Sequence, residues 1–221
     1  MPFSDCDTQC CFCDKTLDRF GDHALACCGG GDRTKRHNLI RNGVYFATHA
    51  ANLHPELEKP GLLPPRPLVG STYENGSPHD PSDSDAGARR PADVYLPRWR
   101  LGPPAALDFA ITSGMRLDSV NDSVTDPCAA PTRYEDFKSA YKDTGALCRE
   151  QGFSFIPMIM EAVGGGWGKS ARCFWSELAK FSAYAQGEFE TESTSAVFLQ
   201  QRLSMILHRE NARACLRRFA T

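Results

Sequence analysis

Residues 90–96 read Arg-Pro-Ala-Asp-Val-Tyr-Leu, and residues 106–112 read Ala-Leu-Asp-Phe-Ala-Ile-Thr. Apolar residues recur at every second position in both segments, which predicts two strands that each bury one face. The segment between them is rich in proline and contains glycine, so we expect a turn that closes an antiparallel hairpin. A symmetric hairpin places Asp93 directly opposite Asp108. The side chains expected on the opposite, buried face are Val94, Leu96, Leu107, Phe109 and Ile111.

Two aspartates at opposed positions create a local electrostatic problem. Their Cβ atoms are expected about 4.5–5.5 Å apart, and like charges at that separation destabilise a sheet. Mg²⁺ binds carboxylate oxygens and would neutralise both charges. We therefore interpret Asp93 and Asp108 as catalytic residues and as ligands of Mg²⁺. The competing interpretation is that both are polar residues that flank a turn and keep it solvated.

The composition is that of a globular protein. The 221 residues suit one domain of ordinary size with a small appendage, and 41% are hydrophobic, which is enough for a core. No apolar run approaches the roughly 18–20 residues of a membrane span. The first residues also lack the basic and apolar regions of a signal peptide. We expect a protein that contacts no membrane.

The net charge of −2 hides two basic clusters. Phosphate contact requires such local concentrations of positive charge rather than a basic average. The first cluster, which we expect to bind nucleic acid, comprises Arg33, Lys35, Arg36, His37 and Arg41. The second comprises Arg209, Arg213, Arg217 and Arg218. It either touches DNA phosphates or forms a solvated helix face balanced by nearby acids.

Six of the ten cysteines lie within residues 6–28. Cys10, Cys13, His23 and Cys27 have the spacing Cys-x2-Cys-x9-His-x3-Cys, which is typical of a tetrahedral structural zinc site. Alternative ligands remain in Cys6, Cys11 and Cys28, and the competing interpretation is a disordered tail of free or oxidised thiols. The other four cysteines are scattered singly, which favours reduced thiols and hence the cytosol or the nucleus.

Helical and strand patterns organise the rest of the chain. We expect helices at 34–53, 131–150, 169–186 and 193–219, a buried strand at 153–161 and a flexible loop at 64–90. The predicted domains are a zinc-binding subdomain (1–32), an α/β core that includes the flexible loop (33–165) and a C-terminal helical extension (166–221).

The helix predicted at 131–150 carries a lysine that we expect to lie close to Asp93 and Asp108. One stripe at helical spacing, which we expect to pack on the sheet, comprises Tyr134, Phe137, Tyr141, Gly145 and Cys148. Lys138 lies at the edge of this stripe, where its ammonium can reach the aspartates, and Lys142 is turned roughly 40° further out. An ammonium there can orient or deprotonate an attacking water and stabilise developing charge. The competing interpretation is an ordinary surface lysine.

Asp93 after Pro91-Ala92, followed by Asp108, resembles the motif of the PD-(D/E)XK nuclease superfamily. More narrowly, the chain resembles the restriction-like endonuclease domain of site-specific non-LTR retrotransposon proteins. In those domains a Cys-Cys-His-Cys zinc motif precedes an Arg-His-Asn helix start (residues 36–38 here), a Lys/Arg-Pro-Asp motif and a second acid. The similarity covers about residues 10–165. It implies a restriction-endonuclease-like α/β core with a mixed sheet flanked by helices, Mg²⁺-dependent cleavage of DNA, and a larger retroelement protein with a reverse transcriptase.

The chain departs from this pattern at two places. Asp93 follows alanine rather than proline, and Ala110 stands where the parent motif has its lysine. The resemblance transfers the lysine's role to Lys138, with Lys142 second. We expect a further acid, Glu161, to assist catalysis, and Glu58 could match an acidic residue that some superfamily members carry near the first helix. The competing interpretation is that both are ordinary carboxylates at strand ends. The competing functions are a non-catalytic zinc-dependent nucleic-acid-binding module on a degenerate nuclease fold and an interaction domain of a retroelement protein.

Residues 163–170 read Val-Gly-Gly-Gly-Trp-Gly-Lys-Ser and are similar to a phosphate-binding loop between a strand and a helix. Such a loop requires glycine where this chain has Val163, and the bulky Trp167 does not suit a backbone that wraps phosphates. We therefore predict a simple strand-to-helix turn.

Overall fold

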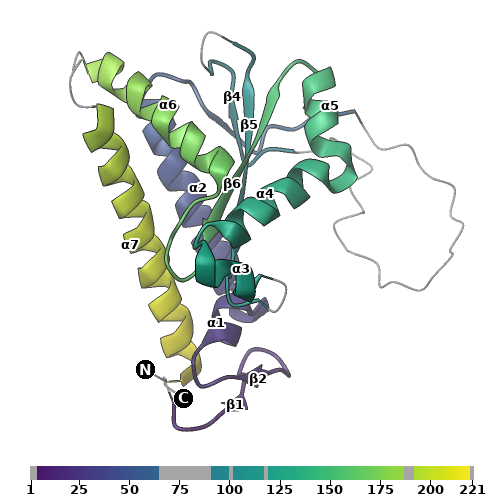
Figure 1. Ribbon diagram of the computed structural model, residues 1–221, viewed down its shortest axis with the longest axis vertical. Coiled ribbons are helices and arrows are strands. Elements are labelled where there is room, and N and C mark those ends of the chain that lie inside the picture. The colour runs from purple at the N-terminus through teal and green to yellow at the C-terminus, as the bar shows by residue number, and fades with distance from the viewer. Residues whose placement is uncertain (1–3, 65–90, 100–101, 117–118, 187–191, 220–221) are drawn as a thin grey trace, which may run out of the picture.

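A mixed four-stranded sheet with helices on both faces forms the centre of the protein in the computed structural model (Figure 1). The structure describes residues 4–64, 91–99, 102–116, 119–186 and 192–219. The sheet has the order β3-β4-β5-β6, in which β5 and β6 are parallel and the other pairs antiparallel. Its strands are β3 (Glu56–Leu57), β4 (Val94–Leu96), β5 (Ala105–Thr112) and β6 (Ser154–Glu161). The predicted α/β class with a mixed sheet is confirmed, and the predicted flexible loop falls, apart from residue 64, outside the described residues.

The predicted hairpin register is observed. Val94 pairs with Leu107 and Leu96 with Ala105, so the same register brings Asp93, just before β4, across from Asp108 in β5. The backbone N–H of Asp93 donates to the carbonyl of Leu107 (2.8 Å), which ends the regular ladder at this point. The period-two pattern thus specified which residues face one another.

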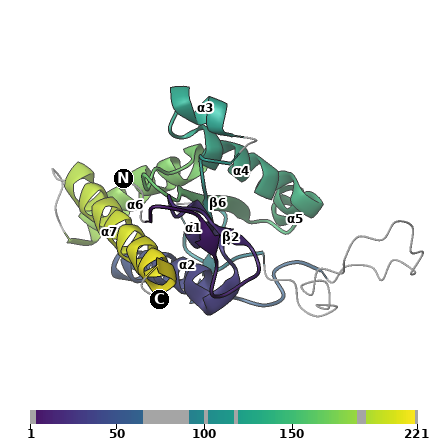
Figure 2. The ribbon, with the colours of Figure 1, turned by 90° about the horizontal axis from the view of Figure 1, so that it is seen from below.

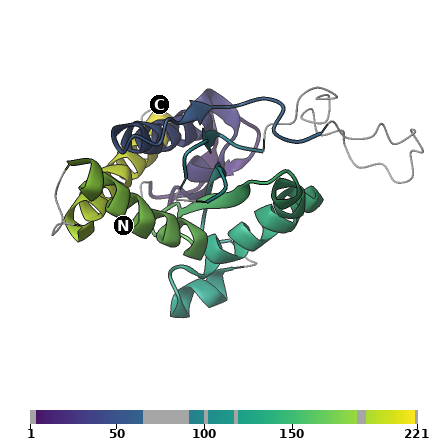
Figure 3. The ribbon, with the colours of Figure 1, turned by 90° about the horizontal axis from the view of Figure 1, so that it is seen from above.

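The two faces of the sheet are covered by different helices. Side chains of α2 (Asp32–Ala50), α6 (Lys169–Gln186) and α7 (Glu192–Phe219) join Val94, Leu107 and Met158 in the main core. Ala106 and Phe153 form a smaller cluster with Cys148 of α5 (Thr144–Glu150) on the opposite face. Seen from above, the strands run between α2 and the pair α4 (Ala129–Ala140) and α5 (Figure 3). Asp108, which alternates with Leu107 and Phe109, belongs to the face toward α4.

The prediction of one continuous helix at 131–150 is wrong. The structure has α4, a 3₁₀ turn at Tyr141–Asp143 and then α5. Lys142 and Asp143 have positive φ angles of 52° and 56°, a left-handed conformation that an α-helix does not continue. Gly145 permits the tight turn, because a Cβ there would lie 3.0 Å from the carbonyl oxygen of Ser139.

The prediction that Phe137 and Tyr141 belong to a face packed on the sheet is also wrong. Phe137 is 51% exposed and Tyr141 44%, whereas Ala130, Pro131 and Glu135 are buried. The Glu135 carboxylate accepts hydrogen bonds from the backbone N–H groups of Ser170 (2.8 Å) and Ala171 (3.1 Å), at the start of α6. Packing of this charged residue against α6 therefore turns the aromatic residues outward.

The N-terminal segment is built onto the end of α7. It consists of the strands β1 (Thr8–Gln9) and β2 (Thr16–Leu17), helix α1 (Asp22–Ala26) and a 3₁₀ turn at Gly29–Gly31 (Figure 2). Cys10, Leu17, Ala24 and Cys27 share a small apolar cluster with Cys215 of α7. The predicted N-terminal and C-terminal parts therefore contact one another directly.

Asp32 at the start of α2 binds three of the four arginines of the second basic cluster. Its buried carboxylate accepts hydrogen bonds from Arg213 (3.1 Å), Arg217 (2.7 Å) and Arg218 (2.9 Å). Arg209 pairs with Glu210 instead (3.0 Å). Of the two interpretations given for these arginines, balance by nearby acids matches the structure. No helix among the described residues combines the length and the apolar character of a membrane span.

We expect Asp32→Ala to lower the free energy of unfolding by about 3–5 kcal/mol, because it leaves the fully buried Arg218 guanidinium without its counter-ion. Burial raises the pKa of Asp32, but the hydrogen bonds from Arg218 and Arg217 outweigh it and hold the pKa below its ordinary value. This stabilisation is therefore present above about pH 4 and lost as the pH falls further.

Urea titration at pH 7 measures the effect of Asp32→Ala. The matched control is Asp122→Ala, which removes an exposed ion pair with Arg133 and is expected to cost about 0–1 kcal/mol. Equal midpoints for the two variants would contradict a structural role for Asp32.

Candidate active site and metal centre

Asp93 and Asp108 share one cavity of about 300 Å³ with residues from two helices. Asp108 lies in β5 and Asp93 just before β4, while His37 comes from α2 and Lys138 from α4. The four polar side chains are 20–26% exposed, so the site is partly buried but accessible to solvent. The structure thus brings together the aspartate pair and the lysine that the sequence pattern associated with it.

Each carboxylate is held by a cationic or N–H donor. Lys138 Nζ lies 2.8 Å from Asp108 Oδ2, and the N–H of Phe109 donates to Asp93 Oδ2 (2.7 Å). His37 Nε2 lies 3.2 Å from the same Asp93 oxygen and 3.1 Å from the Phe109 carbonyl. Because both neighbours of Nε2 are acceptors, this nitrogen must carry a proton. Among the described residues all these contacts use Oδ2, which leaves Oδ1 of each carboxylate available to a further ligand.

The electrostatics of the cavity reflect partial desolvation and close charges. Burial raises the pKa of Asp108, Asp93 raises it further, and the ammonium of Lys138 opposes both. Burial lowers the pKa of Lys138, but the attraction of Asp108 outweighs it, so the net shift is upward. The hydrogen bond to Asp93 raises the pKa of His37. In this site two carboxylates (Asp93 and Asp108) lie close to two basic side chains (His37 and Lys138), so the charge of each group affects its neighbours.

The other expected catalytic residues lie elsewhere. Lys142 is in the turn after α4, with its ammonium 5.1 Å from the centre of the Tyr141 ring. Glu161 pairs with Thr112, four residues along β5 from Asp108 and hence about 13 Å away along the strand. Its buried carboxylate accepts hydrogen bonds from the N–H groups of Gly114, Val163 and Gly164. Glu161 therefore organises the loops after β5 and β6.

The residues expected to bind nucleic acid are dispersed. Arg33 is exposed and lines the acidic cavity, as does His37, whose partner is Asp93 rather than a surface anion. Lys35 is half-exposed and pairs with Glu210, and Arg41 pairs with Glu58. The expectation for Arg36 needs correction, because it is buried and donates to Asn211 (2.5 Å) and to the Leu25 carbonyl (2.7 Å). Arg36 joins α2 to α1 and α7.

Cys10, Cys13, His23 and Cys27 form a cluster that could hold a metal ion such as zinc, with all their ligand atoms within 4.8 Å of one another. The Sγ atoms of Cys10 and Cys27 are 3.9 Å apart, and those of Cys13 and Cys27 are 3.7 Å apart. Tetrahedral zinc with bonds of about 2.3 Å to sulfur requires sulfur atoms about 3.8 Å apart. The alternative ligands Cys6, Cys11 and Cys28 are exposed and lie outside this cluster.

Local hydrogen bonds preorganise this cluster. The Asp18 carboxylate accepts from the N–H groups of Asp22 (3.1 Å) and His23 (2.6 Å) and thereby fixes the start of α1. His23 and Cys27 are four residues apart, which puts both ligands on one side of that turn. Burial raises the pKa of the Cys10 thiol, but the Phe12 N–H and the neighbouring ligands lower it to about 6 overall.

The glycine-rich segment before α6 is the predicted strand-to-helix turn. Met160 pairs with Trp167, whose side chain is buried in the main core. The start of α6, where a phosphate would bind, is taken by the Glu135 carboxylate. Gly168 is required here because a Cβ would lie 2.2 Å from Glu135 Oε1.

Two contributors to the site were not evident from the sequence pattern. His37 was grouped with the basic cluster because of its neighbours, although only the tertiary contact with Asp93 shows where it acts. Tyr134 lines the acidic cavity although it was expected to pack on the sheet. Its position four residues before Lys138 was the available signal, since such residues share one face of a helix.

No family model matches the chain, and no curated protein is significantly similar to it. What the protein does must therefore be inferred from the chemistry of the acidic cavity and the Cys/His cluster.

Proposed function

We propose that this protein is a Mg²⁺-dependent DNA endonuclease with a restriction-endonuclease-like fold, of the kind found in retroelement proteins that also carry a reverse transcriptase. The observation that supports the proposal most is the meeting of Asp93, Asp108 and Lys138 in one cavity. The mixed sheet agrees with it: Asp108 lies on β5, Asp93 just before the neighbouring antiparallel strand β4, and Lys138 on the later helix α4.

The donor set of the cavity fits Mg²⁺. Asp93 and Asp108 each have one carboxylate oxygen outside the contacts described above, and hard oxygen ligands are what this ion prefers. When bound, Mg²⁺ polarises a phosphoryl oxygen and lowers the pKa of a bound water. His37 and the Phe109 N–H hold Asp93 in place, and the Lys138 ammonium stabilises negative charge that develops on the phosphate.

We further propose that the Cys/His cluster binds structural zinc through Cys10, Cys13, His23 and Cys27. A closed set of four soft or borderline ligands leaves no open position for chemistry, which is the pattern of a structural site. Zinc there would stabilise the segment that precedes α2, the helix that carries Arg33 and His37. In this proposal Arg33 and Lys35 contact the DNA backbone.

Cleavage of supercoiled plasmid by the purified full chain tests the proposal. We expect nicked or linear plasmid in Mg²⁺, and intact but retarded plasmid in Ca²⁺, which binds oxygen ligands but does not support this chemistry as well. Chelation of the divalent cation by EDTA should stop cleavage. Intact plasmid at every Mg²⁺ concentration would contradict the endonuclease.

One observation favours a second function, a zinc-dependent nucleic-acid-binding module without catalysis. Ala110 lines the acidic cavity at the position where the parent motif has lysine. The plasmid experiment separates the two functions, because a binding module retards plasmid in a gel and leaves it uncut in Mg²⁺.

A further inference from the structure

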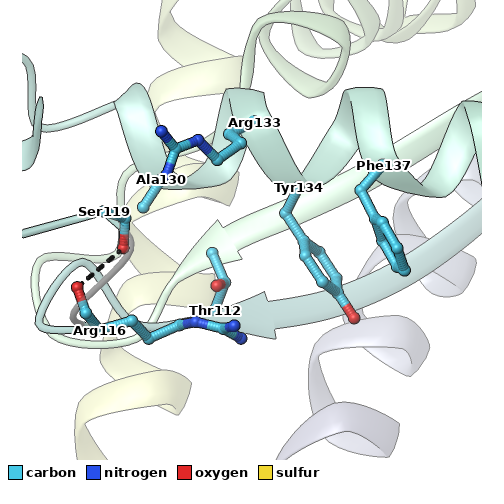
Figure 4. Close-up of a pocket in the computed structure, with 7 residues that line it drawn as sticks. All are labelled: Thr112, Arg116, Ser119, Ala130, Arg133, Tyr134 and Phe137. Atoms are coloured by element: carbon cyan, nitrogen blue, oxygen red, sulfur yellow. Dashed lines mark hydrogen bonds between the residues drawn. The ribbon is translucent and has the colours of Figure 1, made fainter.

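A second cavity of about 470 Å³ adjoins the acidic one, and Tyr134 lines both. Figure 4 shows the Tyr134 and Phe137 rings side by side, extending from the same side of α4. Arg116, Ser119 and Arg133 line the other part of this cavity. Its size is in the range of pockets that hold small ligands, about 300–1,000 Å³.

The aromatic wall continues beyond this cavity along α4. The Tyr134 and Phe137 ring centroids are 5.5 Å apart with the rings tilted by 25°, and Phe137 and Tyr141 are also 5.5 Å apart with a tilt of 35°. The aromatic row is defined as Tyr134, Phe137 and Tyr141. Phe137 is 51% and Tyr141 44% exposed, so both face solvent, while Tyr134 is partly buried. Contiguous exposed apolar side chains often mark a surface that binds a ligand.

The rest of the cavity lining includes cationic and polar side chains. Arg133 pairs with Asp122 at 2.9 Å, but both side chains are more than half exposed. Such exposed ion pairs contribute little to stability, so an anionic ligand can compete for the guanidinium. The Ser119 hydroxyl contacts the backbone carbonyls of Arg116 and Ser113. A cavity lined by flat apolar rings and two arginines matches a ligand that has both a planar base and a phosphate.

We propose that the aromatic row and this cavity bind unpaired nucleotides of the substrate next to the scissile phosphate. The inference rests on the proposed function and adds that the substrate has a single-stranded segment beside the cleavage position. In duplex DNA each base is stacked between its neighbours, so its faces are not available to protein side chains. Unpaired bases stack on aromatic rings with little dependence on sequence, and arginines bind the adjoining phosphates.

Fluorescence anisotropy in Ca²⁺ tests the inference with two labelled probes, an oligothymidine strand and a blunt duplex of equal length. The variant is Phe137→Ala, and its matched control is Phe46→Ala, which removes a 65% exposed ring from α2. We expect Phe137→Ala to weaken binding of the single strand about 5- to 100-fold, as loss of one stacked base implies, and to leave duplex binding nearly unchanged. Tyr141→Ala should act in the same direction, and Phe46→Ala should change neither affinity.

Three outcomes would overturn the inference: equal single-strand affinity in Phe137→Ala and wild type, equal losses on both probes, or no binding of the single strand by the wild type. Because Phe137 is exposed, its replacement leaves the core intact, and an unchanged melting temperature checks this.

Plasmid cleavage by Asp108→Ala keeps the test of the inference separate from that of the endonuclease. Loss of cleavage in Asp108→Ala with unaltered single-strand binding in Phe137→Ala overturns the aromatic site alone. Intact plasmid with the wild type at every Mg²⁺ concentration, together with a selective loss of single-strand binding in Phe137→Ala, overturns the endonuclease assignment alone.

Discussion

Replacing Asp108 by alanine is expected to slow Mg²⁺-dependent plasmid cleavage by at least about 100-fold. Asp108 is the acid at the centre of the site: it lies in β5, pairs with Lys138 and faces Asp93 across the hairpin. Its loss removes half of the proposed Mg²⁺ ligands and leaves the ammonium without its partner. Cleavage rates at saturating protein, measured over a series of Mg²⁺ concentrations, report the effect.

The matched control for Asp108 is Asp136→Ala. Asp136 is an exposed carboxylate on α4, the helix of Lys138, and lines a different cavity. We expect its replacement to leave the cleavage rate within a few-fold of wild type. Retained cleavage in Asp108→Ala would show that the aspartate pair is not the catalytic centre, and the melting temperature of each variant verifies that it folds.

Two variants decide whether Lys138 on α4 or Lys142 in the turn after it is the catalytic lysine. Lys138→Met should reduce cleavage by about 100-fold while DNA binding in Ca²⁺ persists, because the ammonium acts where charge develops in the transition state. Lys142→Met is the control, since Lys142 lies in the 3₁₀ turn beside the Tyr141 ring rather than at Asp108. A larger loss in Lys142→Met than in Lys138→Met would reassign the role.

We expect the second large effect, on zinc binding and on folding, when a ligand of the Cys/His cluster is replaced. Structural zinc binds such sites with an apparent free energy of about 10–16 kcal/mol, and this energy stabilises the fold. We therefore expect Cys27→Ser to abolish stoichiometric zinc binding and to unfold the N-terminal segment. Elemental analysis of the purified protein measures the zinc, and limited proteolysis detects the unfolded segment.

Loss of the metal should destabilise more of the protein than the N-terminal segment. Cys10 and Cys27 share their apolar cluster with Cys215, and Arg217 and Arg218 lie over the Phe12 ring at 4.7 and 4.9 Å. We therefore expect the melting temperature of the whole chain to fall on chelation.

The matched control for the zinc prediction is Cys11→Ser, an exposed cysteine next to Cys10 and outside the cluster. It should retain one zinc per chain and the wild-type melting temperature. If Cys27→Ser also retains its zinc, the ligand set is wrong, and Cys6 or Cys28 must supply a ligand.

Local spacing in the sequence was sufficient to predict that Asp93 and Asp108 lie together and that the four Cys/His residues cluster. The period of two in the hairpin specifies which residues oppose one another, so the register of Asp93 and Asp108 followed from the pattern and the turn. Cys10 and Cys13 flank one turn, and His23 lies in α1 while Cys27 directly follows it, so their spacing specifies a common point. In both cases the deciding distances are within a single short segment.

The orientation of α4 could not be predicted in this way. Helical periodicity identifies a stripe of Tyr134, Phe137 and Tyr141, but it does not say what the stripe meets. Glu135 satisfies N–H groups at the start of α6, 35 residues further along the chain, and this contact decides which side of α4 is buried. Phe137 and Tyr141 consequently face solvent.

The amino-acid sequence by itself indicated the strand register that brings Asp93 near Asp108 and the Cys/His quartet, because each depends on spacing within a short segment. The tertiary structure alone decided that Arg36 is buried, that His37 holds Asp93 and that three arginines of α7 surround Asp32. These roles depend on partners that are 56 to 186 residues apart in the chain, and charged side chains take whichever partner the packing of distant elements brings to them.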